Sequence, residues 1–379
     1  MSTMTTAAVR KENKEQILRY IYRERSSYQK KICEELNISR PTAIPILREC
    51  EQEGVIYKSG YYDSTGGRKP SALHFYADSR IAIGVELLRD SFRMTALNLY
   101  GETLKTESCP VPFAHCGEYY EKVCRAVTDF IAEGGFLPER ILGIGIVLQG
   151  LISSDGKTVT YGKILGCTGL TVDAFTKYLE YPCKLFHDAE AAAQDELWLD
   201  PNLVNGIYMN IREHVSGAVI VNRSFLKGTN LKSGVFEHMS LIPGGRPCYC
   251  GHNGCVETYC STQSFLELAG SLENFFRRLK AEDSACVDCW AEYLDYLASC
   301  INNLRMFIDY PVILGGELAP YLEQEDIDRL HRLISEKTAF PLEKKFISVS
   351  RGGKHAISRG AALPYIREYL DSVMGDSGV

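Results

Sequence analysis

The eighteen residues from His238 to Cys255, HMSLIPGGRPCYCGHNGC, constrain this chain more than any other stretch. They hold two imidazoles, those of His238 and His252, and three thiols, and the Gly-rich turn from Cys250 to Cys255 brings its two flanking sulfurs together. His238, Cys248, Cys250 and Cys255 are a ligand set for tetrahedral zinc. Because protein groups fill all four positions, we expect a structural metal. His252, inside the turn, is a competing ligand, and metal-free cysteines packed as small hydrophobic side chains are the alternative.

The residues around this stretch resemble the zinc loop of the ROK family, a group of repressors, open reading frames and kinases. The family pattern is Gly-Glu-x-Gly-His, followed by Cys-x-Cys-Gly-x-x-Gly-Cys-x-Glu. The cysteine half is matched in full, up to Glu257. In the first half Gly234 and His238 match, whereas Val235 and Glu237 stand where the family has Glu and Gly.

The composition is that of a protein from a reducing compartment. With 379 residues and 45% hydrophobic side chains, the chain has room for two or three domains. It lacks an apolar run of the roughly 20 residues that span a bilayer, and its start lacks the apolar core of a signal peptide. Fourteen cysteines, mostly in apolar surroundings, also favour a cytoplasmic protein. Cys286 and Cys289 form a second Cys-x-x-Cys, which we interpret as part of a helix.

The first 53 residues have the pattern of a helix-turn-helix. Apolar side chains at helical spacing predict a first helix from Arg10. This helix is followed by a short helix over 28–36, a tight turn and a further helix that starts at the N-cap Ser39. In many DNA-binding proteins this arrangement places the last helix, the recognition helix, in the major groove of double-stranded DNA. The candidate contacts to bases or phosphates on this helix are Ser39, Arg40, Thr42 and Arg48.

Residues 54–76 alternate apolar and polar side chains around a Gly-rich turn, as a two-stranded wing does. Arg68 and Lys69 in this turn could reach phosphates or a minor groove. Residues 1–70 carry a net charge of +4 and the other 309 carry −10, which favours an anionic partner at this end. A similar module begins the ROK repressors, and the matching residues are Asn13, Ile17, Leu18, Gly67, Arg68 and Pro70. A protein-docking module of the same shape is the alternative.

Pro45 conflicts with a regular recognition helix. It has no N–H to donate to the carbonyl of Pro41, and its ring clashes with that carbonyl, at a cost of about 3 kcal/mol. We therefore expect the helix to kink, or to begin late, between Pro41 and Ile46.

From Arg80 onward, strand and helix patterns alternate, which predicts an α/β body with a mixed sheet. This order resembles the two-lobed, ribonuclease H-like architecture of sugar kinases, hexokinases and actin, to which the ROK body belongs. The resemblance implies four parts of the chain. They are a winged helix-turn-helix domain at 1–76, a first lobe at 77–200, a second lobe with the zinc loop at 201–355, and a C-terminal helix in 356–379 that returns to the first lobe.

The loops that hold nucleotide phosphates in ROK kinases are altered. The family's first strand carries Asp-x-Gly-Gly-Thr, whereas this chain reads GVELLR from Gly84 to Arg89, and the two leucines would block close approach of the backbone to a phosphate. The second lobe's Gly-Thr-Gly-x-Gly turn is replaced by residues 212–217, of which only Gly217 could still belong to a glycine turn. Glu213 there would repel a phosphate. Because phosphoryl transfer depends on such groups, we expect that the chain is not an enzyme.

Part of the sugar-binding pattern is retained. The family's Asn-Asp-Ala motif, with its catalytic base, corresponds to His187, Asp188 and Ala189. The Asp188 carboxylate could activate or bind a sugar hydroxyl, or it could only cap the following helix. The candidate sugar contacts are Gln149, His187, Asp188, His238 and Glu257. Val235 and His187 depart from the family, so the cleft could bind a modified sugar, bind weakly or bind nothing.

Two hypotheses from different classes follow. The first, which the altered loops and the wing favour, is a DNA-binding regulator, acting as a repressor of carbohydrate metabolism, whose kinase-like body senses a small carbohydrate. The second is a ROK sugar kinase that phosphorylates a hexose or N-acetylhexosamine with ATP. A regulator that answers to a protein partner is a third possibility. Because operators have two-fold symmetry, we expect a homodimer or a tetramer built from dimers, with no membrane partner.

Overall fold

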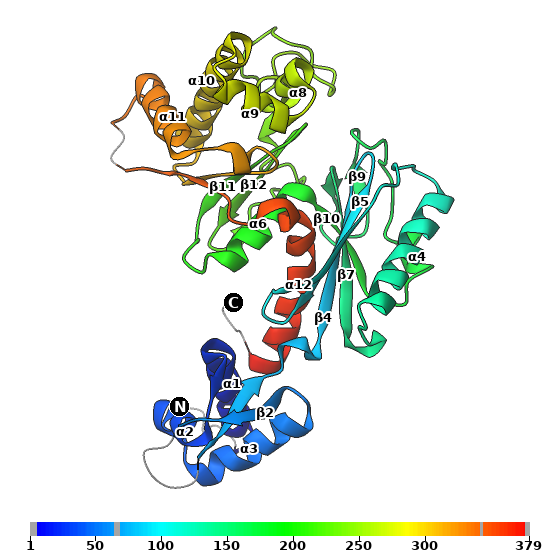
Figure 1. Cartoon of the computed structure of the whole chain (residues 1–379), viewed down its shortest axis with the longest axis vertical. Coiled ribbons are helices and arrows are strands. Elements are labelled where there is room, and N and C mark those ends of the chain that lie inside the picture. The colour runs from blue at the N-terminus through cyan, green and yellow to red at the C-terminus, as the bar shows by residue number, and fades with distance from the viewer. Residues whose placement is uncertain (1–5, 64–68, 342–343, 376–379) are drawn as a thin grey trace.

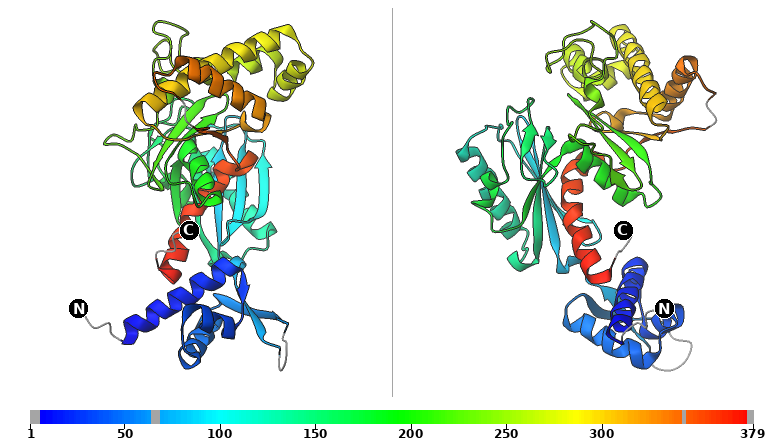
Figure 2. Two further views of the ribbon diagram at one scale, coloured as in Figure 1. Left: turned by 90° about the vertical axis from the view of Figure 1, so that its left-hand side faces the viewer. Right: turned by 180° about the vertical axis from the view of Figure 1, so that it is seen from behind.

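The computed structural model describes residues 6–63, 69–341 and 344–375 of the chain. An N-terminal domain lies at one end of an elongated molecule, and two α/β lobes form the rest (Figure 1). The C-terminal helix, α12 (Ala356–Met374), runs from between the lobes to the N-terminal domain, as both further views show (Figure 2). None of the helices in these ranges combines the length and apolarity that a membrane span requires.

The N-terminal domain is a winged helix-turn-helix. Its helices are α1 (Thr6–Glu24), α2 (Gln29–Leu36) and α3 (Arg40–Gln52). Its small sheet has the order β1-β3-β2, with β1 at Ser26–Ser27, β3 at Ser71–Phe75 and β2 at Ile56–Tyr61. Asn37 ends α2 in the left-handed conformation, with φ of 53°, and the Ser39 hydroxyl accepts a hydrogen bond from the Thr42 amide at 3.4 Å. The predicted turn and N-cap are thus confirmed.

We predicted that the recognition helix either kinks or begins late between Pro41 and Ile46; the late start is wrong, and the kink stays a prediction. Helix α3 begins at Arg40 and continues through Pro45 to Gln52. Pro45 is exposed, whereas Ala43, Ile46 and Leu47 face the core, so its ring lies on the open side of the helix. The N-cap at Ser39 and Pro41 in the first turn favour the early start, because Pro41 has the φ of a helix and loses only an amide that would be unpaired there.

The first lobe is built on a mixed five-stranded sheet of order β10-β7-β4-β5-β6. Its strands are β4 (Ile81–Leu87), β5 (Phe92–Asn98), β6 (Thr103–Cys109), β7 (Ile141–Leu148) and β10 (Cys183–His187). Strands β4, β7 and β10 are parallel, and β5 and β6 are antiparallel to their neighbours. Helix α4 (Gly117–Glu133) covers one face, while the short elements β8 (Leu151–Ile152), β9 (Val159–Tyr161) and α5 (Asp173–Thr176) connect β7 to β10. The expected mixed sheet is confirmed.

The second lobe repeats this design with a sheet of order β13-β12-β11-β14-β15. Its strands are β11 (Gly206–Ile211), β12 (Val215–Val221), β13 (Ser224–Phe225), β14 (Val312–Gly315) and β15 (Ile347–Val349). Its helices are α7 (Glu257–Cys260), α8 (Gln263–Ala269), α9 (Leu272–Lys280), α10 (Ser284–Phe307) and α11 (Gln324–Lys337). Cys286 and Cys289 lie in α10, as expected.

Two helices join the lobes by packing across the space between them. Helix α6 (Asp188–Leu199) follows the last strand of the first lobe, yet its alanines pack on Tyr208, Ala218 and Ile313 of the second sheet. Helix α12 (Ala356–Met374) follows the second lobe and packs on the first sheet, which confirms its expected return. Glycine permits this closeness, because a Cβ at Gly84 would overlap the Ser358 carbonyl and one at Gly360 would overlap the Ala191 carbonyl.

The N-terminal domain is continuous with the body through one apolar core. Ile17 and Ile21 of α1 belong to the same buried cluster as Leu97 of β5 and Ile366 and Leu370 of α12. Polar contacts strengthen the joint, because the Tyr22 hydroxyl donates to the Leu99 carbonyl at 2.9 Å and Arg25 pairs with Glu102 at 2.7 Å. The boundaries predicted at 76, 200 and 355 fall between elements, but side-chain packing crosses each of them.

Candidate functional site

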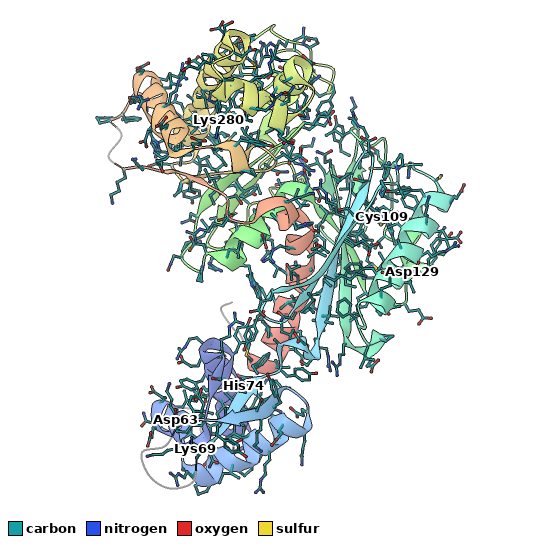
Figure 3. The ribbon with its side chains drawn as sticks, in the orientation of Figure 1. Asp63, Lys69, His74, Cys109, Asp129 and Lys280 are labelled. Carbon is teal, nitrogen blue, oxygen red and sulfur yellow. The ribbon has the colours of Figure 1, made fainter. Side chains whose placement is uncertain are left out.

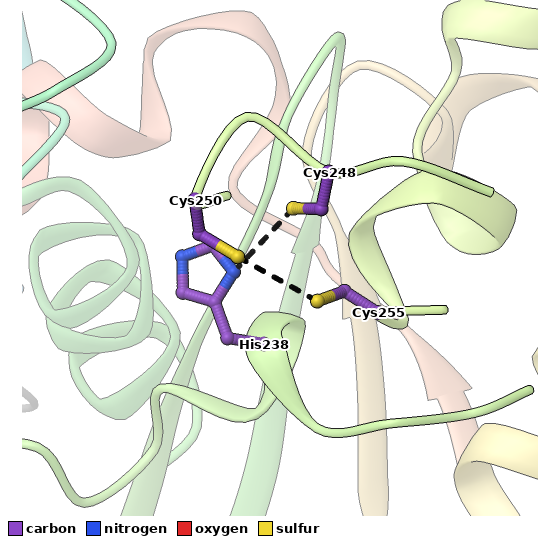
Figure 4. Close-up of side chains that lie close together, drawn as sticks. All are labelled: His238, Cys248, Cys250 and Cys255. Carbon is purple, nitrogen blue, oxygen red and sulfur yellow. Dashed lines mark hydrogen bonds between the residues drawn. The ribbon is translucent and has the colours of Figure 1, made fainter. Parts of the chain in front are cut away.

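The His-Cys stretch folds into a compact loop with its four candidate ligands together. His238 ends the short 3₁₀ helix Phe236–His238, and the three cysteines follow in a turn. The Cys248 amide donates to the His252 carbonyl at 2.8 Å, which closes this turn. Gly254 has a φ of 84°, and a Cβ there would overlap the Ile242 carbonyl, so only glycine fits. Side chains from both ends of the loop therefore converge (Figure 4).

The geometry of this cluster fits a tetrahedral metal. The four ligand atoms lie within 4.8 Å of one another, with 3.7 Å between the Cys250 and Cys255 sulfurs and 3.8 Å between the Cys248 sulfur and Nδ1 of His238. Four ligands about 2.3 Å from a central zinc ion would lie about 3.8 Å apart. Burial lowers the pKa of His238, which favours the neutral imidazole that a metal needs. His252 is exposed and outside the cluster.

A cavity of about 880 Å³ lies beside this loop, where the two lobes meet. Gln149 at the end of β7, His187 and Asp188 at the junction of β10 and α6, and His238 all line it. Glu257 is buried behind the wall, where it accepts hydrogen bonds from the Val215 amide at 2.8 Å and from His214 at 2.6 Å. Thus the fold brings four of the five candidate sugar contacts to one cavity, and the role of Glu257 as a ligand contact stays a prediction.

Asp188 is not a helix cap, so that alternative is wrong. The residue preceding α6 is His187, whose side chain makes no capping bond, and Asp188 is the first helical residue. Its Oδ2 accepts from the Asn210 amide at 3.0 Å and from the Ser216 hydroxyl at 2.9 Å, both in the second lobe. Asp188 is 2% exposed. Its carboxylate is therefore held toward the cavity by the opposite lobe rather than used by its own helix.

The segments expected to replace the phosphate loops meet each other across the lobes. Arg212, at the end of β11, pairs with Glu86 of β4 at 2.8 Å and with Glu317 at 3.1 Å. Arg89 and Glu213 form a second, exposed pair at 3.2 Å. Both Glu86 and Arg212 are buried. An ion pair between side chains thus occupies a place where a kinase of this fold would be expected to present backbone amides to phosphates.

The idea that Gly217 could belong to a glycine turn is also wrong. Gly217 lies inside strand β12, paired with Met209 of β11, and a Cβ there would overlap the Phe236 ring. The absence of a side chain at Gly217 leaves room for the Phe236 ring to pack against the sheet. The sequence did not point to Asn210, Ser216 or Arg212 as site residues, because their partners lie in the other lobe.

The candidate DNA-binding residues that the structure describes are on the open side of the N-terminal domain. Ser39, Arg40, Thr42 and Arg48 are exposed along α3, and within the described ranges neither Arg40 nor Arg48 forms an ion pair. The Ser39 and Thr42 hydroxyls are 2.8 Å apart. Lys69 pairs with Asp63 at 3.1 Å beside the wing, at the end of the molecule far from the lobes (Figure 3). Arg68 lies outside the described residues.

Comparison with known families decides what this architecture is. The ROK family model matches residues 82–366, which is most of the chain. The chain belongs to the ROK family. A model described as a winged helix-turn-helix DNA-binding domain matches residues 10–57, ahead of the ROK body.

Among curated ROK relatives, the xylose repressor of Caldicellulosiruptor bescii is 25% identical over 353 residues, covering 86% of this chain and 88% of that protein. The DNA-binding transcriptional dual regulator NagC of Escherichia coli K12 is 25% identical over 231 residues, covering 60% of this chain and 57% of that protein. Both similarities are modest in identity.

Solved ROK structures share the fold. A ROK family transcriptional regulator, described as a homologue of the E. coli MLC protein, superposes with a TM-score of 0.74 at 18% identity and covers 97% of this chain and 98% of its own. The ROK hexokinase of Thermus thermophilus gives a TM-score of 0.61 at 20% identity, covering 77% of this chain and 99% of its own. The hexokinase thus leaves about a quarter of this chain without a counterpart.

Proposed function

We propose that this ROK protein is a sequence-specific DNA-binding transcription regulator, acting as a repressor of carbohydrate metabolism, that responds to a sugar or sugar derivative in its interlobe cavity. The observation that carries this proposal is the joint between the winged helix-turn-helix and the lobes through α12 and one apolar core. Such a joint allows a ligand-dependent change between the lobes to alter the placement of the recognition helix. The named repressor relatives support the same function.

The DNA contacts in this proposal are Ser39, Arg40, Thr42, Arg48, Arg68 and Lys69. The sugar contacts are Gln149, His187, Asp188 and His238, with Glu257 supporting the wall or reaching the ligand. The metal is zinc, held by His238 and the three loop cysteines, and when bound it supplies structure alone, because the protein fills all four positions. A homodimer would match a two-fold operator, with a tetramer as the larger assembly.

A ROK sugar kinase is the second candidate, because the Asp188 carboxylate is retained at the cavity and a further cavity of about 480 Å³ adjoins Arg212 and Glu317. The buried Glu86–Arg212 pair argues against it, since the pair places a carboxylate and not a phosphate beside the guanidinium. We therefore expect that the chain does not turn over ATP.

One experiment separates these functions. The zinc-loaded full chain is titrated with palindromic duplexes selected from a random library at two salt concentrations, and ATP hydrolysis is assayed with hexoses, pentoses and N-acetylhexosamines. We expect salt-sensitive binding to a selected duplex that one carbohydrate changes, with no sugar-dependent hydrolysis. Sugar-dependent ATP turnover without selection of any duplex would assign the chain to the kinases.

A further inference from the structure

The cavity contains two buried carboxyl groups that each keep an oxygen without a hydrogen-bond partner in the described structure. Asp188 uses Oδ2 for Asn210 and Ser216, but Oδ1 has no hydrogen bond, and Nε2 of His187 lies 3.4 Å from the Oδ1 atom. Glu237, in the 3₁₀ helix that carries the metal ligand, is 6% exposed, and its Oε2 is likewise unbonded. Both residues line the same cavity.

An unpaired polar group in such a place is destabilising, because it has lost its hydrogen bonds to water without gaining a partner in the protein. Glu237 does not serve the metal loop, because its side chain is outside the four-residue cluster. It also departs from the ROK pattern, which has glycine at this position, while the pattern's glutamate is replaced by Val235. Compared with the family pattern, this chain lacks a carboxyl group at Val235 and has one at Glu237, and both residues line the cavity.

Two other polar side chains near the cavity, those of Glu257 and Tyr249, already have partners in the protein. Both Glu257 oxygens accept hydrogen bonds from the β12 segment, and the Tyr249 hydroxyl lies 3.3 Å from Nε2 of His238. The lysines that line the cavity, Lys163 and Lys232, are exposed. The buried wall therefore offers acceptors, whereas cationic groups are confined to the solvent-exposed rim, where water and salt weaken their hold on an anion.

From this arrangement, and resting on the proposed function, we propose that Asp188 and Glu237 together bind hydroxyl groups of an uncharged sugar, with Glu237 as the residue that sets the specificity of this protein. A carboxyl oxygen meets a hydroxyl donor at a normal hydrogen-bond distance and gains most where water is absent. A phosphate or carboxylate placed at this wall would instead face Asp188. Neutral sugars and glycosides are accordingly the ligand class, and sugar phosphates and uronic acids are excluded.

The test measures calorimetric affinity of the zinc-loaded full chain for neutral sugars, their 6-phosphates and uronic acids. We expect a neutral sugar to bind, and Glu237→Gln and Asp188→Asn each to weaken it by about 10-fold or more, as loss of a hydrogen bond to a carboxylate does. Glu139→Gln, the same change at an exposed residue of the first lobe, should leave the affinity unchanged. Metal content and thermal midpoint establish that each variant is folded.

Three outcomes would overturn the inference. If only phosphorylated or acidic sugars bind, or if Lys232→Gln abolishes binding while Glu237→Gln and Asp188→Asn do not weaken it, the effector is an anion and the regulatory function stands. If a neutral sugar binds equally well to both acid variants, the effector class stands and the assigned residues fall. If no carbohydrate binds while a selected duplex does, the sugar-sensing part of the proposed function fails together with this inference.

Discussion

At the scale of single residues, the surroundings of a few side chains favour one class of binding partner, a cation or an anion. The candidate metal cluster gathers three thiols and one imidazole within 4.8 Å, an arrangement that a bound cation would stabilise. On α3, by contrast, Arg40 and Arg48 are exposed and without an ion pair in the described ranges, so their charges are available to an anionic partner.

Cys250→Ser should release the metal and destabilise the second lobe, because an alcohol is a poor zinc ligand. We expect the thermal midpoint to fall by roughly 10 °C, since a structural zinc contributes several kcal/mol. Metal analysis and thermal unfolding with and without a chelator measure this. Cys116→Ser, an exposed cysteine outside the cluster, is the matched control. A Cys250→Ser protein as stable as the parent in chelator would rule out a structural metal.

Arg40→Ala should weaken binding to a selected duplex by about 10-fold at fixed salt and relax its sequence preference if the guanidinium reads a base. Arg48→Ala should weaken binding to all duplexes and lower the slope of log affinity against log salt by about 1, as loss of a phosphate contact does. Fluorescence anisotropy over a salt series gives both values. Arg125→Ala, exposed on α4 in the first lobe, should change neither.

At the scale of elements, α6 and α12 decide how the lobes and the N-terminal domain are joined. Each helix follows one lobe in sequence and packs on the sheet of the other, so neither lobe completes its core alone. Asp188 begins α6 at the cavity, and the far end of α12 shares a core with α1. A shift of α6 against α12 could therefore move the recognition helix, because α12, α1 and α3 share one buried cluster.

The contact between these helices is tight enough to test with one methyl group. Gly360→Ala should destabilise the protein by about 1–3 kcal/mol, because its Cβ would overlap the Ala191 carbonyl of α6. Gly117→Ala, in the first turn of α4 with nothing near its Cβ, should stay within about 0.5 kcal/mol. Chemical denaturation compares the two. Equal stability of both variants would mean that α6 and α12 pack more loosely than the structure shows.

At the scale of the whole molecule, the lobes are held together where a kinase would bind phosphates. Glu86 and Arg212 come from different lobes and are both buried, while the Arg89–Glu213 pair lies outside them in solvent. Buried pairs add little net stability over apolar side chains, but removing one partner leaves a costly charge. The arrangement thus fixes the relative position of the lobes more than it strengthens the fold.

Arg212→Met should destabilise the chain by about 1–3 kcal/mol, because the buried Glu86 would lose its partner at 2.8 Å and keep only Arg93, at 3.6 Å, as a counter-charge. Combining it with Glu86→Leu should recover much of that loss, giving a coupling of 1 kcal/mol or more, of the order found for contacting residues. Arg89→Met, in the exposed pair, should cost less than about 1 kcal/mol. Additive effects of the Glu86 and Arg212 changes in denaturation experiments would contradict an interlobe ion pair.

The features that the sequence alone determined are local. The turn at Asn37, the N-cap at Ser39 and the spacing of the metal ligands are set within a few residues, because caps, turns and short loops are governed by the chemistry of their own segment. The return of α12 to the first lobe was expected only through the family resemblance, since no short-range pattern encodes where a terminal helix packs.

Only the tertiary structure decided which distant side chains meet. Glu86 and Arg212 are 126 positions apart, and Asp188 finds Asn210 and Ser216 in the opposite lobe, so no spacing rule could pair them. Glu237 likewise looked like a departure from a motif until the fold placed it on the cavity wall. The physical reason is that the energy of a buried charged group depends on the low dielectric constant around it and on the partners that packing places beside it. Both are set by residues from many parts of the chain.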